Sequence, residues 1–333
     1  MQKLYTGAFL ELTKSETQGE ILSILQKRFE DLNINYILLK GSSLNKLYPK
    51  PELRTMSDLD ILIHLDDYTI VRENMIDLGF TEEYESNHEL VWRKGSVLVE
   101  IHKKLVPTYN EDFYQYFGDG WKNVVTSETS RCFYTPEDEF IYIFTHFAKH
   151  YRGGGIGLRQ FCDIYLYLKY YSLDLDYVET ELSKLKLLAF YKNVSNAISA
   201  FFLGEDFDEL SELICETVIS NGAFGTKSSN TNALILRSAR GTAINGKHAR
   251  LYLFKMKVFP KKEFIESKYP YLVKKPWLLP IAWISRWFSV IFKDRGKIST
   301  AVSQINSAKS ADATAFEENL NKVGLDFNFK EKS

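Results

Sequence analysis

The sequence predicts an α+β fold, in which a small mixed β-sheet flanked by helices is followed by a mostly helical domain. Short apolar runs with strand-like alternation separate amphipathic segments in the first part of the chain. Helical spacing of apolar residues dominates after about Thr135. The chain has 333 residues, of which 45% are hydrophobic, so it is long enough for two domains that each have a core.

In the first part of the chain, each element is predicted by its own local pattern. Helices are expected where apolar residues recur at every third or fourth position, and strands where they alternate. Gly41 ends the first strand and Gly79 caps a helix, whereas Pro49 and Pro51 require a loop. The expected elements are a helix at Glu20–Leu32, a strand at Asn35–Leu39, a short helix at Ser42–Leu47, a loop at Tyr48–Ser57, a strand at Leu59–Leu65, a helix at Tyr68–Leu78 and a hairpin of Leu90–Arg93 with Ser96–His102.

The rest of the chain is expected to be mainly helical. We expect a first domain at residues 1–130, a helical domain at 131–298 that completes a cleft, and a polar C-terminal tail at 299–333 with partial disorder. The stretch Ser220–Gly246 is rich in Ser, Asn, Gly and Thr, which is typical of a long loop. The expected helices are Pro136–His150, Leu158–Tyr171, Val178–Phe202 and Phe207–Ser220.

Composition narrows the class of protein. The formal net charge is −1, so the chain has no global basic excess that would favour binding to long nucleic acids. The three cysteines have the spacing of neither a zinc site nor a disulfide framework, which favours buried, reduced thiols. Glu11 interrupts the apolar run that a signal peptide would need. We therefore expect a cytoplasmic protein.

One apolar segment, Trp277–Phe292, leaves two interpretations open. It is shorter than the roughly 20 residues that a membrane-spanning helix needs, and it contains Pro280 and Arg286. The first interpretation is a buried helix that packs between domains. The second is a helix in peripheral contact with a membrane surface, which the neighbouring basic residues Lys274 and Lys275 would favour.

The first candidate for chemistry is Lys40-Gly41-Ser42-Ser43, between a strand and a helix. Glycine allows a close approach of the backbone to a ligand, and the amides at the start of the helix can hold a phosphate. Lys40 either contacts that phosphate or simply ends the strand. Arg54, in the following loop, can grip a triphosphate in a bidentate manner or lie in solvent.

The second candidate is the pair of aspartates in Asp58-Leu59-Asp60. Residues two apart on a strand point to the same face, so the two carboxylates converge while Leu59 points into the core. Convergent carboxylates repel each other, and Mg²⁺, which prefers oxygen ligands, relieves that repulsion. The alternative is a pair of solvated acids at a strand edge.

The third candidate is Glu100, an acid within the apolar strand Val97–His102. Such an acid is a poor core residue unless it is paired or binds metal. If this strand lies next to the strand of Asp58 and Asp60, three carboxylates can hold two cations about 3.5–4 Å apart. Glu100 is then the candidate general base. His102 shares the face of Glu100, where it can touch a nucleotide or hydrogen-bond a carboxylate.

A run of motifs across residues 20–106 carries a family resemblance. The run consists of Leu39-Lys40-Gly41-Ser42, Leu47-Tyr48-Pro49, Arg54, Asp58-Leu59-Asp60, Leu78-Gly79-Phe80, His88 and Val99-Glu100-Ile101-His102. It resembles the signature of the polymerase beta superfamily of nucleotidyltransferases. Within that superfamily, it is similar to the bacterial uncharacterised nucleotidyltransferase family.

The resemblance implies a reaction in which an NMP group moves from a nucleoside triphosphate such as ATP to an acceptor hydroxyl, with release of pyrophosphate. It also implies two Mg²⁺ ions, for which Mn²⁺ can substitute. The acceptor can be a small molecule, a sugar, a protein side chain or an RNA end. Two alternatives remain open. A sugar-nucleotide glycosyltransferase explains Asp58 and Asp60 but not Glu100. A non-catalytic nucleotide-binding module does not explain why all three acids are present.

Overall fold

The structure is a computed structural model, and it divides into two compact units. The sheet unit comprises Met1–Ile143, Leu166–Val178 and Glu331–Ser333, and the helical unit comprises Phe144–Tyr165 and Glu179–Lys330. Most of the expected loop Ser220–Gly246 lies outside the described residues. Described are residues 2–108, 110–223, 231–233, 236, 248–265, 268–269, 271–293, 298–299, 301–302, 305 and 310–325.

The sheet unit contains a seven-stranded mixed sheet with the strand order β3-β4-β5-β2-β1-β7-β6. The pairs β2–β5 and β1–β7 are parallel, and the other neighbours are antiparallel. The mixed sheet followed by helices confirms the predicted fold class. The strands are β1 (Tyr36–Leu38), β2 (Asp58–Ile63), β3 (Thr81–Glu85), β4 (Glu89–Lys94), β5 (Val97–His102), β6 (Val124–Thr126) and β7 (Arg131–Tyr134).

Three of these strands, β3, β6 and β7, have no counterpart among the predicted elements. β3 reads Thr-Glu-Glu-Tyr-Glu and has no buried residue, so it lacks the apolar alternation that marks a strand. β6 and β7 have only three and four residues. β7 also lies beyond residue 130, where we expect the first domain to end; the domain boundaries stay a prediction.

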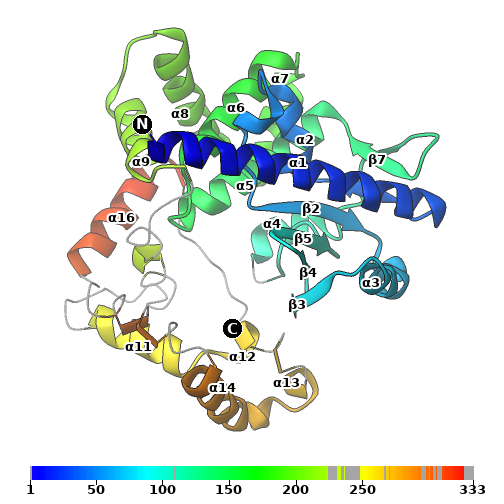
Figure 1. The fold of residues 1–333 in the computed structure, drawn as a ribbon. Helices are drawn as coiled ribbons and strands as arrows, with labels where there is room; N and C mark the ends of the chain where they lie inside the picture. The colour runs from blue at the N-terminus through cyan, green and yellow to red at the C-terminus, as the bar shows by residue number, and fades with distance from the viewer. Residues whose placement is uncertain are drawn as a thin grey trace. The chain divides into compact units, whose positions relative to one another are not determined.

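A single apolar core fixes one face of this sheet. Helix α1 (Gln2–Asp31) packs against the sheet (Figure 1), where it contacts β5, and α3 (Tyr68–Asp77) packs into the same core. Only the second half of α1 was predicted, because its apolar residues in the core, Ile21, Leu25 and Phe29, all lie there. The strands contribute alternate residues to this core: Tyr36 and Leu38 from β1, Leu59, Ile61 and Ile63 from β2, Leu90 and Trp92 from β4, and Val97, Val99 and Ile101 from β5.

Short helical turns and helix α4 complete the sheet unit, and helix α5 has its first residues in the sheet unit and the rest, from Phe144, in the helical unit. The segment predicted as a short helix at Ser42–Leu47 is a helix followed by a 3₁₀ turn, and the predicted loop at Tyr48–Ser57 contains another 3₁₀ turn. Helix α5 begins at Pro136, close to the predicted change in pattern at Thr135. These elements are α2 (Gly41–Leu44), η1 (Asn45–Leu47), η2 (Pro51–Leu53), η3 (Leu65–Asp67), α4 (Glu111–Phe117) and α5 (Pro136–Arg152).

The helix predicted at Val178–Phe202 is wrong, because the chain breaks inside it. Two helices replace it, and between them Lys186 has a φ of 58°, a left-handed conformation that cannot continue an α-helix. Leu185 and Leu187 on either side of Lys186 are buried, and their packing stabilises the break. The sequence does not signal this break, because neither glycine nor proline occurs at it. Among the described residues, the helices that follow α5 are α6 (Leu158–Tyr170), α7 (Leu175–Lys184), α8 (Leu188–Ile198), η4 (Ser199–Leu203), α9 (Glu209–Ser220), α11 (His248–Val258), α12 (Lys262–Ile265), α13 (Tyr271–Lys274), η5 (Pro276–Leu278), α14 (Leu279–Lys293) and α16 (Ser310–Lys322).

The polar C-terminal segment includes an ordered helix, α16, that packs on α8. Val323 is fully buried, and its carbonyl accepts a hydrogen bond of 3.1 Å from Asn193 Nδ2. Gly324 follows with a φ of 83°, and a side chain there would lie 3.0 Å from the Cβ of Ala189. A few apolar residues, among them Leu320, are therefore enough to order part of a segment that is mostly polar.

Two glycine substitutions are expected to change the stability of the fold in opposite directions. A Cβ at Gly157 would lie 2.4 Å from the carbonyl oxygen of Gly222, so Gly157→Ala must push two backbone segments apart. We expect Gly157→Ala to destabilise the fold by about 1–3 kcal/mol. Gly19 lies in α1 with open space around it, and Gly19→Ala should stabilise by about 0.5–1 kcal/mol. Denaturant unfolding measures both changes, and a Gly157→Ala variant as stable as the parent would contradict the close approach.

Candidate active site

Two central strands bring the candidate acids together. β2 and β5 pair in parallel, and their register sets Asp60 directly beside Glu100. Asp58 lies two residues before Asp60 on β2, so it belongs to the same face of the sheet. Because β2 is the fourth of the seven strands, the aspartates lie in the middle of the sheet and not at its edge. This face is the one opposite to the core under α1.

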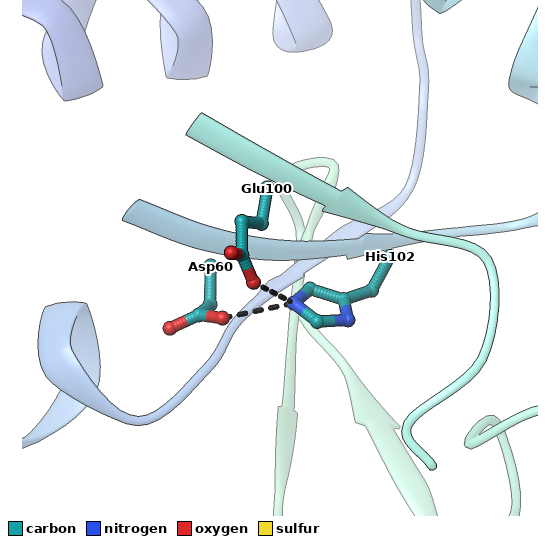
Figure 2. Close-up of side chains that lie close together, drawn as sticks. All are labelled: Asp60, Glu100 and His102. Carbon is teal, nitrogen blue, oxygen red and sulfur yellow. Dashed lines mark hydrogen bonds and ion pairs between the residues drawn. The ribbon is translucent and has the colours of Figure 1, made fainter. Parts of the chain in front are cut away.

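His102 joins these acids from β5. Figure 2 shows Nε2 of its imidazole facing both carboxylates, at 2.8 Å from Asp60 Oδ1 and 3.5 Å from Glu100 Oε2. His102 reaches this position because it stands two residues after Glu100, on the same face of the strand. One possible ligand atom from each of the three residues lies within 4.8 Å of the other two. Such a group of oxygen and nitrogen atoms can hold a metal ion.

Lys40 supplies a second positive group. Its Nζ lies 2.7 Å from Asp60 Oδ1, the same oxygen that faces His102. The backbone of Lys40 has a φ of 42°, which is uncommon for a residue with a side chain and carries strain. The residue ends the passage from β1 to α2, and this turn brings its ammonium group to the acid face of β2.

The charges in this cluster are strongly coupled. Burial, together with the nearby carboxylates of Asp60 and Glu100, raises the pKa of Asp58 to about 6. Burial opposes the ionisation of Asp60 as well, but Lys40 and His102 outweigh it and hold the pKa of Asp60 well below its usual range. Burial also works against the charged form of His102, yet its hydrogen bonds to Asp60 and Glu100 raise the pKa of His102 to about 9. Without a metal ion at Nε2, these contacts favour the protonated, positively charged imidazole.

A side chain at Gly41 would push against the ends of two neighbouring side chains in the turn after β1. An added Cβ would lie 2.8 Å from Met56 Sδ and 3.0 Å from Arg54 Nη1. Arg54 is buried, so it is not the solvated loop arginine that the sequence left open. Gly41 is needed for the close approach of these side chains, whereas the unusual backbone angle falls on Lys40.

The Ser42 hydroxyl differs from the backbone amides of this turn, because it is not engaged within the turn. The amide of Ser42 donates to the carbonyl of Leu39 (3.3 Å), and the amide of Ser43 donates to that of Lys40 (3.1 Å). These two amides, which we expected to hold a phosphate, are thus engaged within the turn. Ser42 Oγ is buried and has no hydrogen-bond partner among the described residues.

The site also includes residues that the sequence analysis missed. Glu89 pairs with His102 across β4 and β5, and its Oε2 lies 2.8 Å from His88 Nε2. Burial disfavours its charge, but His88 outweighs burial and lowers the pKa of Glu89 to about 2. Strand alternation across the hairpin would have found Glu89. Tyr142 on α5 is buried, and burial together with the nearby acids raises its pKa. No local pattern points to Tyr142.

The donor chemistry of the cluster fits a divalent cation. Burial, followed by repulsion from the carboxylates of Asp60 and Glu100, raises the pKa of Asp58, and a bound cation would relieve that repulsion. Mg²⁺ and Mn²⁺ both take carboxylate oxygens. All eight candidate residues are described, and seven lie on β2, on β5 or in the adjoining turn: Asp58, Asp60, Glu100, His102, Lys40, Gly41 and Ser42. The eighth, Arg54, packs against that turn.

A sheet that presents carboxylates from two parallel central strands beside a Gly-Ser turn defines a class, the nucleotidyltransferases. The family described as "uncharacterised nucleotidyltransferase" matches residues 10–202, which is more than half of the chain. The chain therefore belongs to this family, and it is a nucleotidyltransferase. The match also confirms the family resemblance that the sequence motifs carry. None of the curated proteins compared with the chain matches it.

Two solved structures are similar to part of the chain. The antibiotic-resistance factor ANT(2'')-Ia is 12% identical with a TM-score of 0.39, and the match covers 57% of this chain and 100% of that one. An antigenic nucleotidyltransferase-like protein from Paracoccidioides brasiliensis is 16% identical with a TM-score of 0.36, and the match covers 55% of this chain and 95% of that one. Likeness at this level carries no conclusion about substrates.

The low pKa of Glu89 predicts a pH-dependent stability. A carboxyl with a pKa of about 2 in the folded protein and an ordinary value of 4.5 stabilises the fold above pH 4.5. That contribution is lost as the pH falls from 4.5 towards 2. We therefore expect Glu89→Gln to lower the Tm at pH 7, and the difference from the parent should shrink below about pH 5. Circular dichroism melts measure both values.

The exposed acid Glu128 offers a matched control. Glu128→Gln should change the Tm little at any pH, because the exposed carboxylate remains solvated after folding. A Tm difference for Glu89→Gln that stays constant between about pH 7 and pH 3 would contradict the linkage.

Proposed function

We propose that this protein transfers an NMP group from a nucleoside triphosphate to an acceptor hydroxyl, with release of pyrophosphate. One observation carries the proposal: the register of β2 and β5 sets Asp60 beside Glu100, with Asp58 on the same face. Like-charged side chains rarely gather in a sheet unless a cation joins them. The membership in a nucleotidyltransferase family supports the same reaction.

Asp58, Asp60 and Glu100 are the residues that would hold two Mg²⁺ ions, or Mn²⁺ in their place. The ions would supply charge neutralisation for the triphosphate and for the attacking oxygen. Asp60 and Glu100 also belong to the group of possible metal ligands that includes His102. Asp58 completes it, since its carboxylate interacts electrostatically with both of the other acids.

Glu100 is best suited to accept the proton of the acceptor hydroxyl. Its side chain is 20% exposed, whereas that of Asp60 is 4% exposed. Asp60 Oδ1 already accepts from Lys40 and faces His102, and these contacts stabilise its charge and weaken it as a base. Glu100 makes the longer contact with His102, at 3.5 Å, and is open to an approaching acceptor.

Lys40 and His102 act as positioning residues for Asp60. Both contact the same carboxylate oxygen, so they orient the carboxylate and offset its charge. Each can also contact a phosphate oxygen of the nucleotide, since both carry hydrogen-bond donors. Such a pre-arranged electrostatic setting is what nucleotidyl transfer needs, because positioning and charge neutralisation supply most of the rate enhancement in phosphoryl chemistry.

The turn at Gly41, Ser42 and Arg54 would bind the triphosphate. The buried hydroxyl of Ser42 is a donor without a partner among the described residues, and a phosphate oxygen would satisfy it. Arg54 lies against Gly41 and brings a planar guanidinium that suits bidentate contact with phosphate. A larger residue at Gly41 would separate these two groups.

A screen by mass spectrometry tests the proposed reaction. The full chain is mixed with Mg²⁺, the four nucleoside triphosphates and a cell extract, and acceptors are detected by a mass increase of one NMP. Small molecules, sugars, proteins and RNA ends are read in separate fractions of one reaction, so the screen also identifies the acceptor. Binding of triphosphate without release of pyrophosphate would instead indicate a non-catalytic module.

The acids are the first residues to test. We expect Asp58→Asn, Asp60→Asn and Glu100→Gln each to reduce pyrophosphate release at least about a hundredfold, because each removes a negative charge from the reacting centre. Asp66→Asn, an exposed aspartate on η3, is the matched control and should retain full turnover. Circular dichroism verifies the fold of each variant. Full activity of either Asn variant at Asp58 or Asp60 would remove the metal-site argument.

Arg54 tests the triphosphate site separately. Arg54→Lys keeps the charge but loses the bidentate contact, so we expect the KM for the triphosphate to rise about tenfold while kcat changes less. Arg72→Lys is the control, since Arg72 is bound to Glu82 on the surface of α3 and should leave the KM unchanged. An unchanged KM in Arg54→Lys would place the triphosphate elsewhere.

A further inference from the structure

A stripe of apolar side chains lies exposed along α14 and the turn before it. Trp277, Ile281, Ile284 and Phe288 are 72%, 57%, 48% and 59% exposed. Their spacing of three or four residues places them on one face of the helix. An apolar face of this kind is the reverse of what a surface helix normally presents to water.

The opposite face of α14 is fastened to the end of α11. Trp283 Nε1 donates to the carbonyl of Pro260 at 2.8 Å, and Trp287 Nε1 donates to that of Val258 at 2.7 Å. Arg286 Nη1 donates to the carbonyl of Lys257, also at 2.7 Å. Figure 1 shows α11 and α14 side by side. The three bonds set the rotation of α14 about its axis, and the stripe is left exposed on its other face.

The partner helix adds exposed apolar residues of its own. On α11, Leu251 and Phe254 are exposed at helical spacing, and Phe259 follows at the end of the helix. Phe259 also packs edge-on against Trp283 and Trp287. Phe259 therefore joins the end of α11 to the tryptophans of α14.

The segment that carries these helices is strongly basic. Residues 248–293 contain ten Lys and Arg and two Glu, a net charge of +8, whereas the whole chain has a net charge of −1. Lys274 and Lys275 are exposed directly before the stripe, and Lys255 is exposed on α11. Long lysine side chains can lay their apolar stems along a membrane while the ammonium groups reach the lipid headgroups.

We propose that α11 and α14 dock on the surface of a bilayer that contains anionic phospholipids. The exposed Trp, Phe and Ile side chains would enter the boundary between headgroups and acyl chains, and the lysines would pair with the lipid charges. Charge complementarity favours an anionic membrane over a second copy of the chain. Docking of two copies through this surface would bring together two segments that each have a net charge of +8. In the described residues, no helix is long and apolar enough to cross a membrane. The contact is thus peripheral, and it is independent of nucleotidyl transfer.

Vesicle co-sedimentation of the full chain tests the proposal. We expect binding to vesicles of phosphatidylcholine with about one third phosphatidylglycerol, and at least tenfold weaker binding to phosphatidylcholine alone. Raising the salt from about 0.1 M to about 0.5 M should weaken the binding to the vesicles that contain phosphatidylglycerol, because it screens the lysine charges. The tryptophan emission should shift to the blue on binding as Trp277 leaves water.

Two variants and a matched control identify the surface. Ile281→Ser/Ile284→Ser/Phe288→Ser should lose at least tenfold in binding, and Lys274→Glu/Lys275→Glu should lose a similar amount. The control is Ile76→Ser/Tyr170→Ser/Ile219→Ser, in which the three residues are 57%, 56% and 53% exposed on other helices. It should bind as the parent does.

Several results would overturn the proposal. Equal binding of the parent to both kinds of vesicle, no binding to either, or full binding by the stripe variant would each do so. Light scattering after size-exclusion chromatography tests whether a second copy of the chain, and not a membrane, occupies this surface. A dimer of the parent that the stripe variant dissociates, without vesicle binding, would make a second copy the occupant.

Discussion

The site depends on one electrostatic constraint, the juxtaposition of Asp60 and Glu100 in the parallel ladder of β2 and β5. Carboxylates this close repel each other, and burial strengthens the repulsion. The chain offsets it with Lys40 and His102, which both contact Asp60 Oδ1. Burial, followed by repulsion from Asp60 and Glu100, raises the pKa of Asp58 although Lys40 acts against this shift, and three carboxylates thus face only two positive groups. The remaining negative charge is what makes the cluster receptive to a divalent cation.

The hydrophobic core on the far side of the sheet keeps these acids in register. Leu59 and Ile61 alternate with the aspartates on β2, and Val99 and Ile101 flank Glu100 on β5; all four are fully buried. A slip of either strand by one residue would turn acids into the core and apolar side chains out. The packing of α1 against this core thus specifies the position of the acidic face, although α1 supplies none of the acidic side chains.

Local patterns in the sequence predict what one strand can show by itself. Alternation within β2 places Asp58 and Asp60 on one face, and alternation within β5 does the same for Glu100 and His102. The direct pairing of Asp60 with Glu100 is a long-range contact that only the assembled sheet defines. The break at Lys186 is missed for a similar reason, since burial of its leucine neighbours holds it. The sequence does not predict β3, because a strand at the edge of a sheet can be polar on both faces.

The net charge of the whole chain hides a large difference in charge between two parts of the sequence. The value of −1 suggests weak electrostatics, yet residues 248–293 carry +8 and the other 287 residues carry −9, from 32 Lys and Arg and 41 Asp and Glu. A single average therefore hides two opposite tendencies. The acidic majority of the chain carries the carboxylate cluster and favours cations, whereas the basic segment carries exposed aromatic residues and favours anionic surfaces. Under these proposals, opposite net charges on different segments let one nearly neutral chain bind a divalent cation through its carboxylates and an anionic membrane through its basic segment.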